Sequence, residues 1–145
     1  MKILQLGKFY PIRGGVEMVM EIFTEGLAER GYASDMLCAS HDGRVDDVIL
    51  GEKSKIMRTK TLMKLAATMI SPGMIWCLRK ICREYDIIHI HHPDPMATVA
   101  LFCSGYKGKV VLHWHSDILK QKFLLRFFAP LQNWLIRRVD LILGT

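Results

Sequence analysis

Several features that would assign the chain to a class at once are missing from its sequence. No apolar run reaches the roughly eighteen residues that a membrane-spanning helix requires. The apolar stretch ILQLG after Lys2 is too short for the core of a signal peptide. The four cysteines form neither a C-x-x-C pair nor a zinc-finger spacing. These absences predict a cytoplasmic protein whose cysteines are buried apolar residues without disulfides.

Motifs that bind nucleotides or perform hydrolysis are also missing. The sequence contains neither G-x-G-x-x-G nor G-x-x-x-x-G-K-[ST], which disfavours an NAD-dependent dehydrogenase and a P-loop NTPase. It lacks the nucleophile elbow G-x-S-x-G of hydrolases and the D-x-D motif of metal-dependent sugar transferases. There is no RNP motif, helix-turn-helix or zinc finger either, so no nucleic-acid partner is expected.

The sequence does contain a large apolar fraction and an uneven charge. Half of its 145 residues are hydrophobic, enough to bury a core as one domain over residues 1–145. Residues 1–52 hold five Lys and Arg against nine Asp and Glu, a net charge of −4, whereas residues 53–145 hold fifteen against five, a net charge of +10. A basic part of this kind indicates an anionic partner, such as a phosphorylated substrate or a lipid headgroup surface, or simply a soluble surface.

Apolar runs of strand length alternate with stretches of helical period. Several runs are continuously apolar, as parallel strands covered on both faces require. The expected strands are 2–6, 33–39, 55–59, 86–92, 109–115 and 140–145, and the expected helices are 15–30, 61–69, 72–84, 94–104 and 120–138. This order predicts an α/β fold with a doubly wound, mainly parallel, Rossmann-like sheet. Because the chain stops on the apolar run DLILGT, we expect it to be a piece of a longer polypeptide.

Two glycines, Gly14 and Gly15, stand between the first expected strand and the first expected helix. In an open α/β sheet this place lies beyond the carboxyl ends of the strands, where the free N–H groups and positive dipole end of a helix attract anions. Glycines there would let a phosphate approach the backbone closely. A tight turn that needs two small residues has the same pattern, so both interpretations stay open.

The first expected helix is amphipathic. Its apolar face consists of Val16, Val19, Met20, Phe23 and Leu27. The opposite face carries an acid at every fourth residue, namely Glu17, Glu21, Glu25 and Glu29. Glu17 and Glu25 have the spacing E-x7-E, which is catalytic in some sugar transferases. A solvated acidic face explains both residues, so we expect no catalytic role for them.

Histidines occur towards the ends of two expected strands, in DIIHIHHPDP and VVLHWHSD. Alternation places His89 and His91 on one face of their strand with His92 on the other, and it places His113 and His115 on a common face. No carboxylate or cysteine accompanies them at ligand spacing, so no metal is expected. Histidines at this edge either contact a ligand, His115 above all, or are held by local backbone hydrogen bonds, as expected for His89.

The order of four motifs resembles the N-terminal half of the retaining glycosyltransferases of family four, which have the GT-B fold. The motifs are PIRGGVE, DIIHIHHPDP, VVLHWHSD and RRVDLILGT, and the resemblance covers the whole chain. In that family two Rossmann-like domains face each other across a cleft. The N-terminal domain mainly receives the acceptor, and the C-terminal domain holds the nucleotide-sugar donor. The resemblance implies that the donor-binding domain is absent from this chain, which alone would transfer no sugar.

The resemblance also implies roles for residues at the carboxyl edge. Gly14 and Gly15 would lie against the donor diphosphate or an acceptor phosphate. His115 matches the family histidine that contacts the transferred sugar near the reacting carbon, and its implied role is positioning and electrostatic stabilisation rather than proton abstraction. Further candidates for contacts with substrate or phosphate are Lys8, Arg13, His91, His92, Ser116 and Asp117. The implied ligands are a nucleotide sugar and an acceptor glycan or lipid-linked sugar, with no further cofactor and no metal.

Two basic stretches, residues 53–83 and 120–138, interleave Lys and Arg with Leu, Met, Phe and Trp. Such stretches either lie on an anionic membrane surface or pack an apolar face on the sheet. Many family members act on lipid-linked acceptors, so the resemblance implies a peripheral position at the cytoplasmic face of the membrane, in polysaccharide or lipopolysaccharide assembly. A partly exposed patch is then expected from Phe123, Phe127, Phe128 and Trp134. The alternative functions are a stand-alone nucleotide-binding or phosphosugar-binding module and a basic membrane-surface binding domain without catalysis.

Overall fold

The computed structural model describes residues 1–11, 14–65, 68–116 and 122–144, with only the backbone described for residues 9, 122–125 and 127. In this part of the chain seven strands form one sheet in the order β3-β4-β2-β1-β7-β8-β9, and only β3 and β4 pair antiparallel. The strands are β1 (Lys2–Tyr10), β2 (Ala33–Ser40), β3 (Asp47–Leu50), β4 (Ser54–Thr59), β7 (Ile87–His92), β8 (Lys109–Trp114) and β9 (Leu141–Gly144). The predicted α/β fold with a mainly parallel, doubly wound sheet is confirmed.

The helices are α1 (Gly15–Glu29), α2 (Pro72–Ile81), α3 (Pro95–Ser104) and α4 (Lys122–Arg138), with a 3-10 turn at Cys82–Glu84. Helices α2 and α3 begin at Pro72 and Pro95, where the missing N–H of proline costs no hydrogen bond. The Asp94 carboxylate caps α3 by accepting from the N–H groups of the second and third helical residues. Local chemistry therefore sets these helix ends where the sequence predicts them.

The prediction of a helix over residues 61–69 is wrong. This segment contains a small antiparallel hairpin of β5 (Met63–Leu65) and β6 (Thr68–Ile70). Hydrogen bonds tie the segment to strand backbone, because the Thr61 hydroxyl donates to the carbonyl of Ser40 at 2.6 Å and the Leu62 N–H donates to that of Ile70 at 2.9 Å. The side chains of Leu62, Met63 and Leu65 are exposed, and of the described side chains of this segment only that of Met69 is buried, which is too small a buried face to hold a helix against the sheet.

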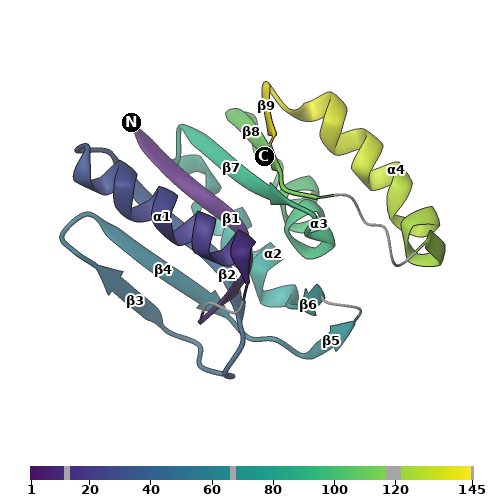
Figure 1. The fold of residues 1–145 in the computed structure, drawn as a ribbon, viewed down its shortest axis with the longest axis horizontal. Coiled ribbons are helices and arrows are strands. Elements are labelled where there is room, and N and C mark those ends of the chain that lie inside the picture. The colour runs from purple at the N-terminus through teal and green to yellow at the C-terminus, as the bar shows by residue number, and fades with distance from the viewer. Residues whose placement is uncertain (12–13, 66–67, 117–121, 145) are drawn as a thin grey trace.

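Helix α1 covers one face of the sheet, and α2, α3 and α4 gather on the other (Figure 1). The larger core lies on the side of α2 and α3 and includes Leu4, Leu6, Met74, Leu78, Ile88, Ile90, Ala100 and Leu112. The core on the α1 side is smaller and consists of Met20, Met36, Cys38 and Ile56. Most of the apolar burial that stabilises the fold is therefore on the face away from α1.

Strand β1 lies at the topological switch point of the sheet. The strands that come next along the chain, beginning with β2, extend the sheet to one side of β1, and the later strands, beginning with β7, extend it to the other. In open α/β sheets ligands bind in the crevice outside the carboxyl ends of the strands at such a point. The carboxyl ends of β1, β7 and β8 lie side by side there, so this edge is where a functional site is expected.

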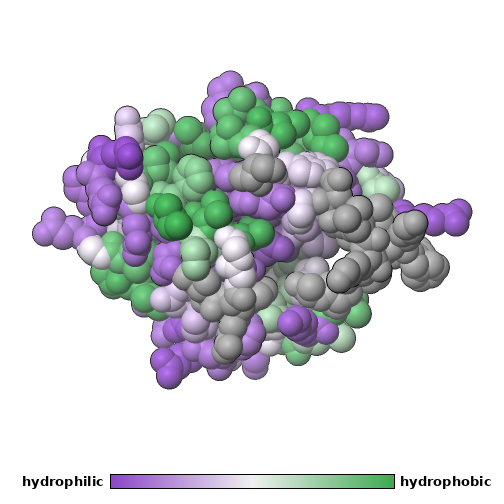
Figure 2. Space-filling view, in the orientation of Figure 1, coloured by the Kyte–Doolittle hydropathy of each residue, from purple (hydrophilic) through white to green (hydrophobic). Residues whose placement is uncertain are grey.

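The far edge of the sheet, at β9, is apolar and exposed. The side chains of Leu141 and Ile142 are 53% and 49% exposed. Figure 2 shows hydrophobic side chains gathered at the top of the molecule, where β9 lies in Figure 1. Among the helices of the described ranges, none has the length and apolar character needed to cross a membrane.

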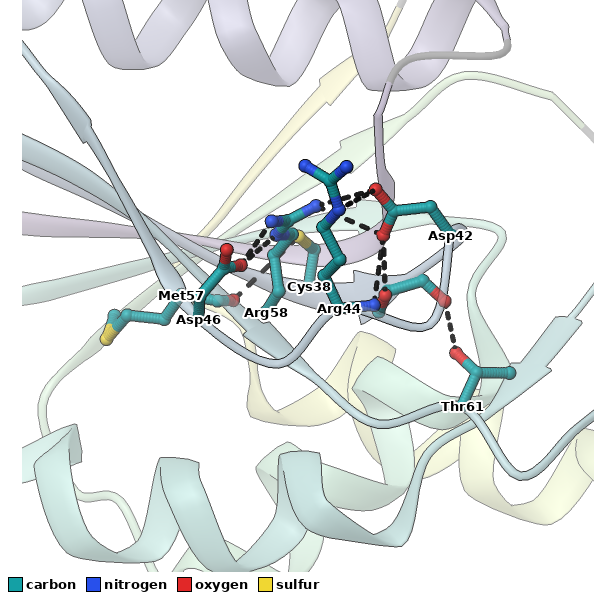
Figure 3. A network of polar contacts seen from close by, with 8 residues as sticks. Cys38, Asp42, Arg44, Asp46, Met57, Arg58 and Thr61 are labelled. Carbon is teal, nitrogen blue, oxygen red and sulfur yellow. Dashed lines mark hydrogen bonds and ion pairs between the residues drawn. The ribbon is translucent and has the colours of Figure 1, made fainter.

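A buried arginine fastens the loop that follows β2. The Arg58 side chain, near the end of β4, is 3% exposed and lies between the carboxylates of Asp42 and Asp46 (Figure 3). Its Nη1 is 3.2 Å from each oxygen of Asp42, and its Nε donates to Asp46 at 2.7 Å. The guanidinium also lies 5.7 Å from the ring centre of Tyr10 at the end of β1. These contacts hold residues 41–46 against the carboxyl edge of the sheet.

We expect Arg58→Met to lower the free energy of unfolding by about 2 kcal/mol, since hydrogen bonds to charged groups contribute about 1.5–3 kcal/mol and the two freed carboxylates can regain water. Lys53→Met is the matched control, because Lys53 is an exposed cation in the same hairpin. Urea denaturation of both variants measures the difference. Equal stability of the two variants would contradict this account of the loop.

Candidate functional site

The side chains of the histidines in β7 and β8 gather on the face of the sheet that α1 covers. His89, His91 and His113 are 5%, 0% and 4% exposed. The Phe23 ring of α1 lies over them, with ring centroids 5.2, 6.5 and 5.7 Å from theirs in that order. The expected alternation is confirmed, since His91 and His113 are also paired across β7 and β8. Polar rings therefore fill a space where apolar residues usually lie.

His91 connects a buried glutamine to His115. Its Nε2 lies 2.8 Å from Oε1 of Gln5 in β1, and its Nδ1 lies 2.9 Å from Nε2 of His115. The His115 ring also stacks on that of His113, with centroids 4.0 Å apart. The N–H of His115 donates to the carbonyl of His92 at 3.1 Å. His115 is thus held by its backbone, by stacking and by a ring hydrogen bond, while remaining partly exposed at the edge of the sheet.

Burial keeps these imidazoles neutral. Desolvation, followed by the nearby His113 and His115, lowers the pKa of His89 to about 4. Desolvation, followed by His113 and the Lys8 ammonium, lowers the pKa of His115 to about 4. The pKa of His91 lies well below its ordinary value, chiefly because of burial, and burial also lowers the pKa of His113. At neutral pH the group can exchange hydrogen bonds with a substrate but carries no charge.

The expectation that local backbone hydrogen bonds hold His89 is wrong. Its ring makes no hydrogen bond to the residues that the structure describes, and its Nε2 is buried. The ring instead contacts those of Phe23, His91 and His113. The reason is the position of His89 in the middle of β7, where the backbone groups are already paired with β1 and β8.

Three of these histidines come close enough to share a metal ion. One ligand nitrogen from each of His89, His91 and His113 lies within 4.8 Å of the others. Both ring nitrogens of His91, however, already lie at hydrogen-bond distance from Gln5 and His115. A metal would have to break one of these contacts, so the absence of a metal remains our prediction.

Gly14 and Gly15 differ in whether the surrounding structure leaves room for a side chain. The backbone of Gly14 is extended, with φ −152°, but a Cβ there would lie 2.7 Å from Oε2 of Glu17. Gly15 begins α1, and a Cβ there would meet no atom of the described residues within 4 Å. Gly14 makes no side-chain cap, so the first N–H groups of α1 keep their capacity to bind an anion. The open space lies on the Gly15 side.

The acidic stripe of α1 is only partly solvated, contrary to expectation. Glu25 and Glu29 are exposed, but Glu17 is buried, with 5% exposure. Glu17 is in the first turn of α1, where a carboxylate is attracted to the positive end of the helix dipole, and the space beside Gly14 receives it. Burial, followed by Glu25, raises the pKa of the half-buried Glu21.

Lys8 is held beside the histidines by the loop that follows β7. Its backbone, with φ +53°, donates an N–H to Oδ2 of Asp94, and its Nζ donates to the carbonyl of Pro93 at 2.5 Å. Burial raises the pKa of Asp94, and Lys8 acts in the opposite direction. The Lys8 charge also lowers the pKa values of His91 and His115. One ammonium therefore lies near the neutral imidazoles, at the same edge.

The remaining predicted site residues are dispersed. The structure places His92 on the opposite face of β7, 2% exposed, with its ring 4.0 Å from that of Trp114, so it does not join His91 and His115. Ser116 directly follows His115 and is exposed. Arg13 and Asp117 lie outside the described residues. The structure thus brings together Lys8, Gly14, Gly15, His91 and His115 as parts of one edge.

Sequence reasoning missed three residues that shape this site, namely Gln5, Phe23 as a cover for the histidines, and Asp94. The signal for Gln5 was a lone amide in the apolar run KILQL, which indicates a buried partner. The signal for Asp94 was its place directly before Pro95, a typical N-cap position. No sequence signal indicates that Phe23 lies on the histidines.

Comparisons with known proteins identify relatives and a fold. Residues 13–145 match the family described as Glycosyltransferase Family 4. The chain is 32% identical to the O-antigen chain mannosyltransferase C of Escherichia coli and 28% identical to the D-rhamnosyltransferase WbpZ of Pseudomonas aeruginosa. These alignments cover 100% and 99% of the chain but only 39% and 38% of the relatives. A sucrose-phosphate synthase from Thermosynechococcus elongatus has the same fold, with a TM-score of 0.66 at 13% identity over 98% of the chain and 42% of that protein.

We expect the free energy of unfolding to fall as the pH is lowered from about 6.5 towards 4. The unfolded chain takes up protons on its histidines near pH 6.5, whereas folded His89 does so only near pH 4. Each histidine kept neutral costs up to about 1.4 kcal/mol per pH unit within this window. Urea denaturation from pH 8 to pH 4.5 measures the slope.

His89→Gln should reduce that slope by one proton. Comparison of the variant with the unmodified chain at pH 8, where the histidines of both states are neutral, separates lost packing from proton uptake. An unchanged slope in His89→Gln would show that His89 is protonated equally in the folded and unfolded states and would contradict the prediction.

Proposed function

Because this chain belongs to glycosyltransferase family 4, we propose that it forms the N-terminal, acceptor-side domain of a retaining transferase that moves a sugar from a nucleotide sugar to a lipid-linked or polysaccharide acceptor. Both curated relatives are named as sugar transferases, one of them of O-antigen chains. The chain spans about two fifths of their length, which leaves room for a donor-binding domain. Mannose and D-rhamnose, the sugars in those names, are the first donors to test.

The observation that carries this proposal is the common edge of Gly15, Lys8 and His115. The open space beside Gly15, the free N–H groups of α1 and the Lys8 ammonium together favour a phosphate group. The buried Glu17 carboxylate lies on the Gly14 side, so the phosphate is expected on the Gly15 side, away from that charge. A diphosphate held by the other domain would reach this place when the cleft closes.

His115 would orient the sugar at the same edge. An imidazole with a pKa near 4 is a weak base, so it is better suited to hydrogen-bond a sugar hydroxyl than to remove a proton from the acceptor. Its ring orientation is fixed by His91 and His113, which reduces the ordering cost on substrate binding. The proposed mechanism therefore uses His115 for positioning and for electrostatic stabilisation, and it needs no metal.

The hairpin of β5 and β6 supports a peripheral position at the cytoplasmic face of an anionic membrane. Its exposed side chains combine the apolar Leu62, Met63 and Leu65, which are 64%, 57% and 49% exposed, with the exposed cations Lys60 and Lys64. Apolar side chains flanked by lysines are typical of segments that touch an anionic lipid surface.

The aromatic patch expected around α4 gives less support to membrane contact. Phe128 and Trp134 are half-buried, and their rings contact those of His92 and Phe102. The side chains of Phe123 and Phe127 lie outside the described residues. The hairpin is therefore the surface that we assign to the membrane.

We expect sugar transfer only from a full-length transferase that carries this chain with a donor-binding domain. Incubation with nucleotide-linked mannose or D-rhamnose and an O-antigen-type acceptor, with EDTA present, should give turnover, and the 145-residue chain alone should give none. Turnover by the chain alone, or none by the full-length protein with either donor, would refute the proposal. Tight nucleotide-sugar binding without transfer would favour a binding module.

In the same assay Gly15→Ala should lower kcat/KM by at least about tenfold, the equivalent of about 1.4 kcal/mol, because its methyl group occupies the space assigned to phosphate. The unfolding free energy should be unchanged or up to about 1 kcal/mol higher, since alanine favours the helix. Gly14→Ala is the contrasting control and should lose stability through its contact with Glu17. Full activity of Gly15→Ala would contradict the phosphate assignment.

Binding to anionic vesicles should depend on the hairpin. Lys60→Gln with Lys64→Gln should weaken co-sedimentation with phosphatidylglycerol vesicles at low salt, since each lysine near the surface contributes about 1 kcal/mol. Lys53→Gln with Lys107→Gln makes the same charge change at the opposite edge of the sheet and is the matched control. Equal weakening by both pairs, or equal binding to neutral vesicles, would count against this surface.

A further inference from the structure

The amide of Gln5 lies in the middle of β1, fully buried, on the face of the sheet where the histidines gather. We propose that Gln5 and His91 are positioning residues for His115, joined in one hydrogen-bond chain that sets which nitrogen of the His115 ring carries the proton. This inference rests on the proposed function, because there His115 binds the sugar and the hydrogen-bond chain orients His115.

The direction of the chain follows from the groups in it. The Oε1 atom of Gln5 can only accept, so Nε2 of His91, 2.8 Å away, must donate. A neutral imidazole has one donor and one acceptor, so Nδ1 of His91 accepts. Nε2 of His115, 2.9 Å from that atom, is then the donor. Both rings thus hold their proton on Nε2, and His115 keeps a lone pair on Nδ1.

Nδ1 of His115 is the acceptor that remains for a ligand. It has no hydrogen-bond partner among the residues within the described ranges. A lone pair at this position accepts a hydrogen bond from a hydroxyl group and repels a phosphate oxygen. The Lys8 ammonium nearby disfavours a proton at this nitrogen as well. The hydrogen-bond chain therefore favours a hydroxyl group of the ligand at His115 and leaves the anionic group to bind at Gly15.

The fold holds the chain rigid at its buried end. Gln5 and His91 are both 0% exposed, and they lie on β1 and β7, which are paired in register from Ile3 to Leu6. At the other end, stacking on His113 fixes the plane of the His115 ring. Reorientation of the His115 ring would cost its hydrogen bond to Nδ1 of His91 and its stacking on His113.

The need to pair buried polar groups does not by itself explain the hydrogen bonds from Gln5 through His91 to His115. His89 and His113 lie on the same face and are equally buried, yet neither takes part in it, and Nε2 of His89 and Nδ1 of His113 lack partners among the described residues. His115 is partly exposed, so water could satisfy its ring. The two ring hydrogen bonds of His91 nevertheless connect the buried Gln5 amide to the one histidine at the ligand edge, His115.

Gln5→Leu removes the acceptor, and nitrogen-15 NMR of the 145-residue chain reads the tautomer of His115. The unmodified chain should show His115 protonated at Nε2. In Gln5→Leu we expect a mixture of the two tautomers, and in the corresponding full-length transferase a fall in kcat of about tenfold to a hundredfold, the range for misplaced catalytic groups. The KM for the acceptor should change less than kcat.

Gln5→Glu keeps an acceptor at the same distance and should restore the Nε2 tautomer and most of kcat. It should also raise the pH at which kcat falls on acidification, because a carboxylate favours a protonated His91. His89→Leu is the matched control from the same face of the sheet. It loses comparable packing but should keep the tautomer of His115.

The outcomes separate this inference from the proposed function. An unchanged His115 tautomer in Gln5→Leu, or an equal change in His89→Leu, would overturn the proposed hydrogen-bond chain even if sugar transfer is observed. Absence of sugar transfer from the unmodified full-length protein would refute the proposed function. The NMR comparison would still show whether the hydrogen-bond chain sets the tautomer of His115. If Gln5→Leu fails to fold, Gln5→Glu alone tests it, and an unshifted pH profile together with a changed tautomer would overturn it.

Discussion

The parallel pairing of β1 with β7 is the constraint on which the rest of this structure depends. Because side chains alternate along a strand, the register of Gln5 with His89 and of Leu6 with Ile90 sends apolar residues towards α2 and α3 and polar residues towards α1. The large apolar core on the first side supplies most of the burial. The second side can then hold an amide and a group of histidines, whose packing would be costly in the main core.

The absence of charge on these histidines decides what the site is suited to do. Four imidazoles lie together on this face, and protonation is opposed by burial at all of them and also by neighbouring groups at His89, His91 and His115. Such a group orients hydroxyl groups well and accepts protons poorly. This supports the proposed division of labour, in which His115 positions a sugar while the open N-terminus of α1 and Lys8 receive phosphate.

Long, continuous apolar runs made the fold predictable. Every expected strand is present, and the helices expected to begin at residues 15, 72 and 94 begin at Gly15, Pro72 and Pro95. The helix predicted over residues 61–69 is wrong because their composition suits a helix, whereas a hydrogen bond from Thr61 to the backbone of β2 and one from Leu62 to Ile70 across the hairpin hold them extended. The prediction for Glu17 is wrong for a similar reason. The acidic stripe predicts that its side chain is solvated, but the space beside Gly14 and the positive end of the helix dipole favour a buried position.

The sequence by itself determined the α/β class, the order of the six expected strands and of the helices outside residues 61–69, the side of each strand on which its histidines lie, and the position of the glycine pair before α1. These are properties of local periodicity and backbone chemistry, which act over a few residues. Only the tertiary structure decided that Gln5 would meet His91, that Phe23 would cover the histidines and that His115 would receive a hydrogen bond partner from another strand. Such contacts join residues up to 86 positions apart, and they depend on strand order and register, which no local pattern encodes.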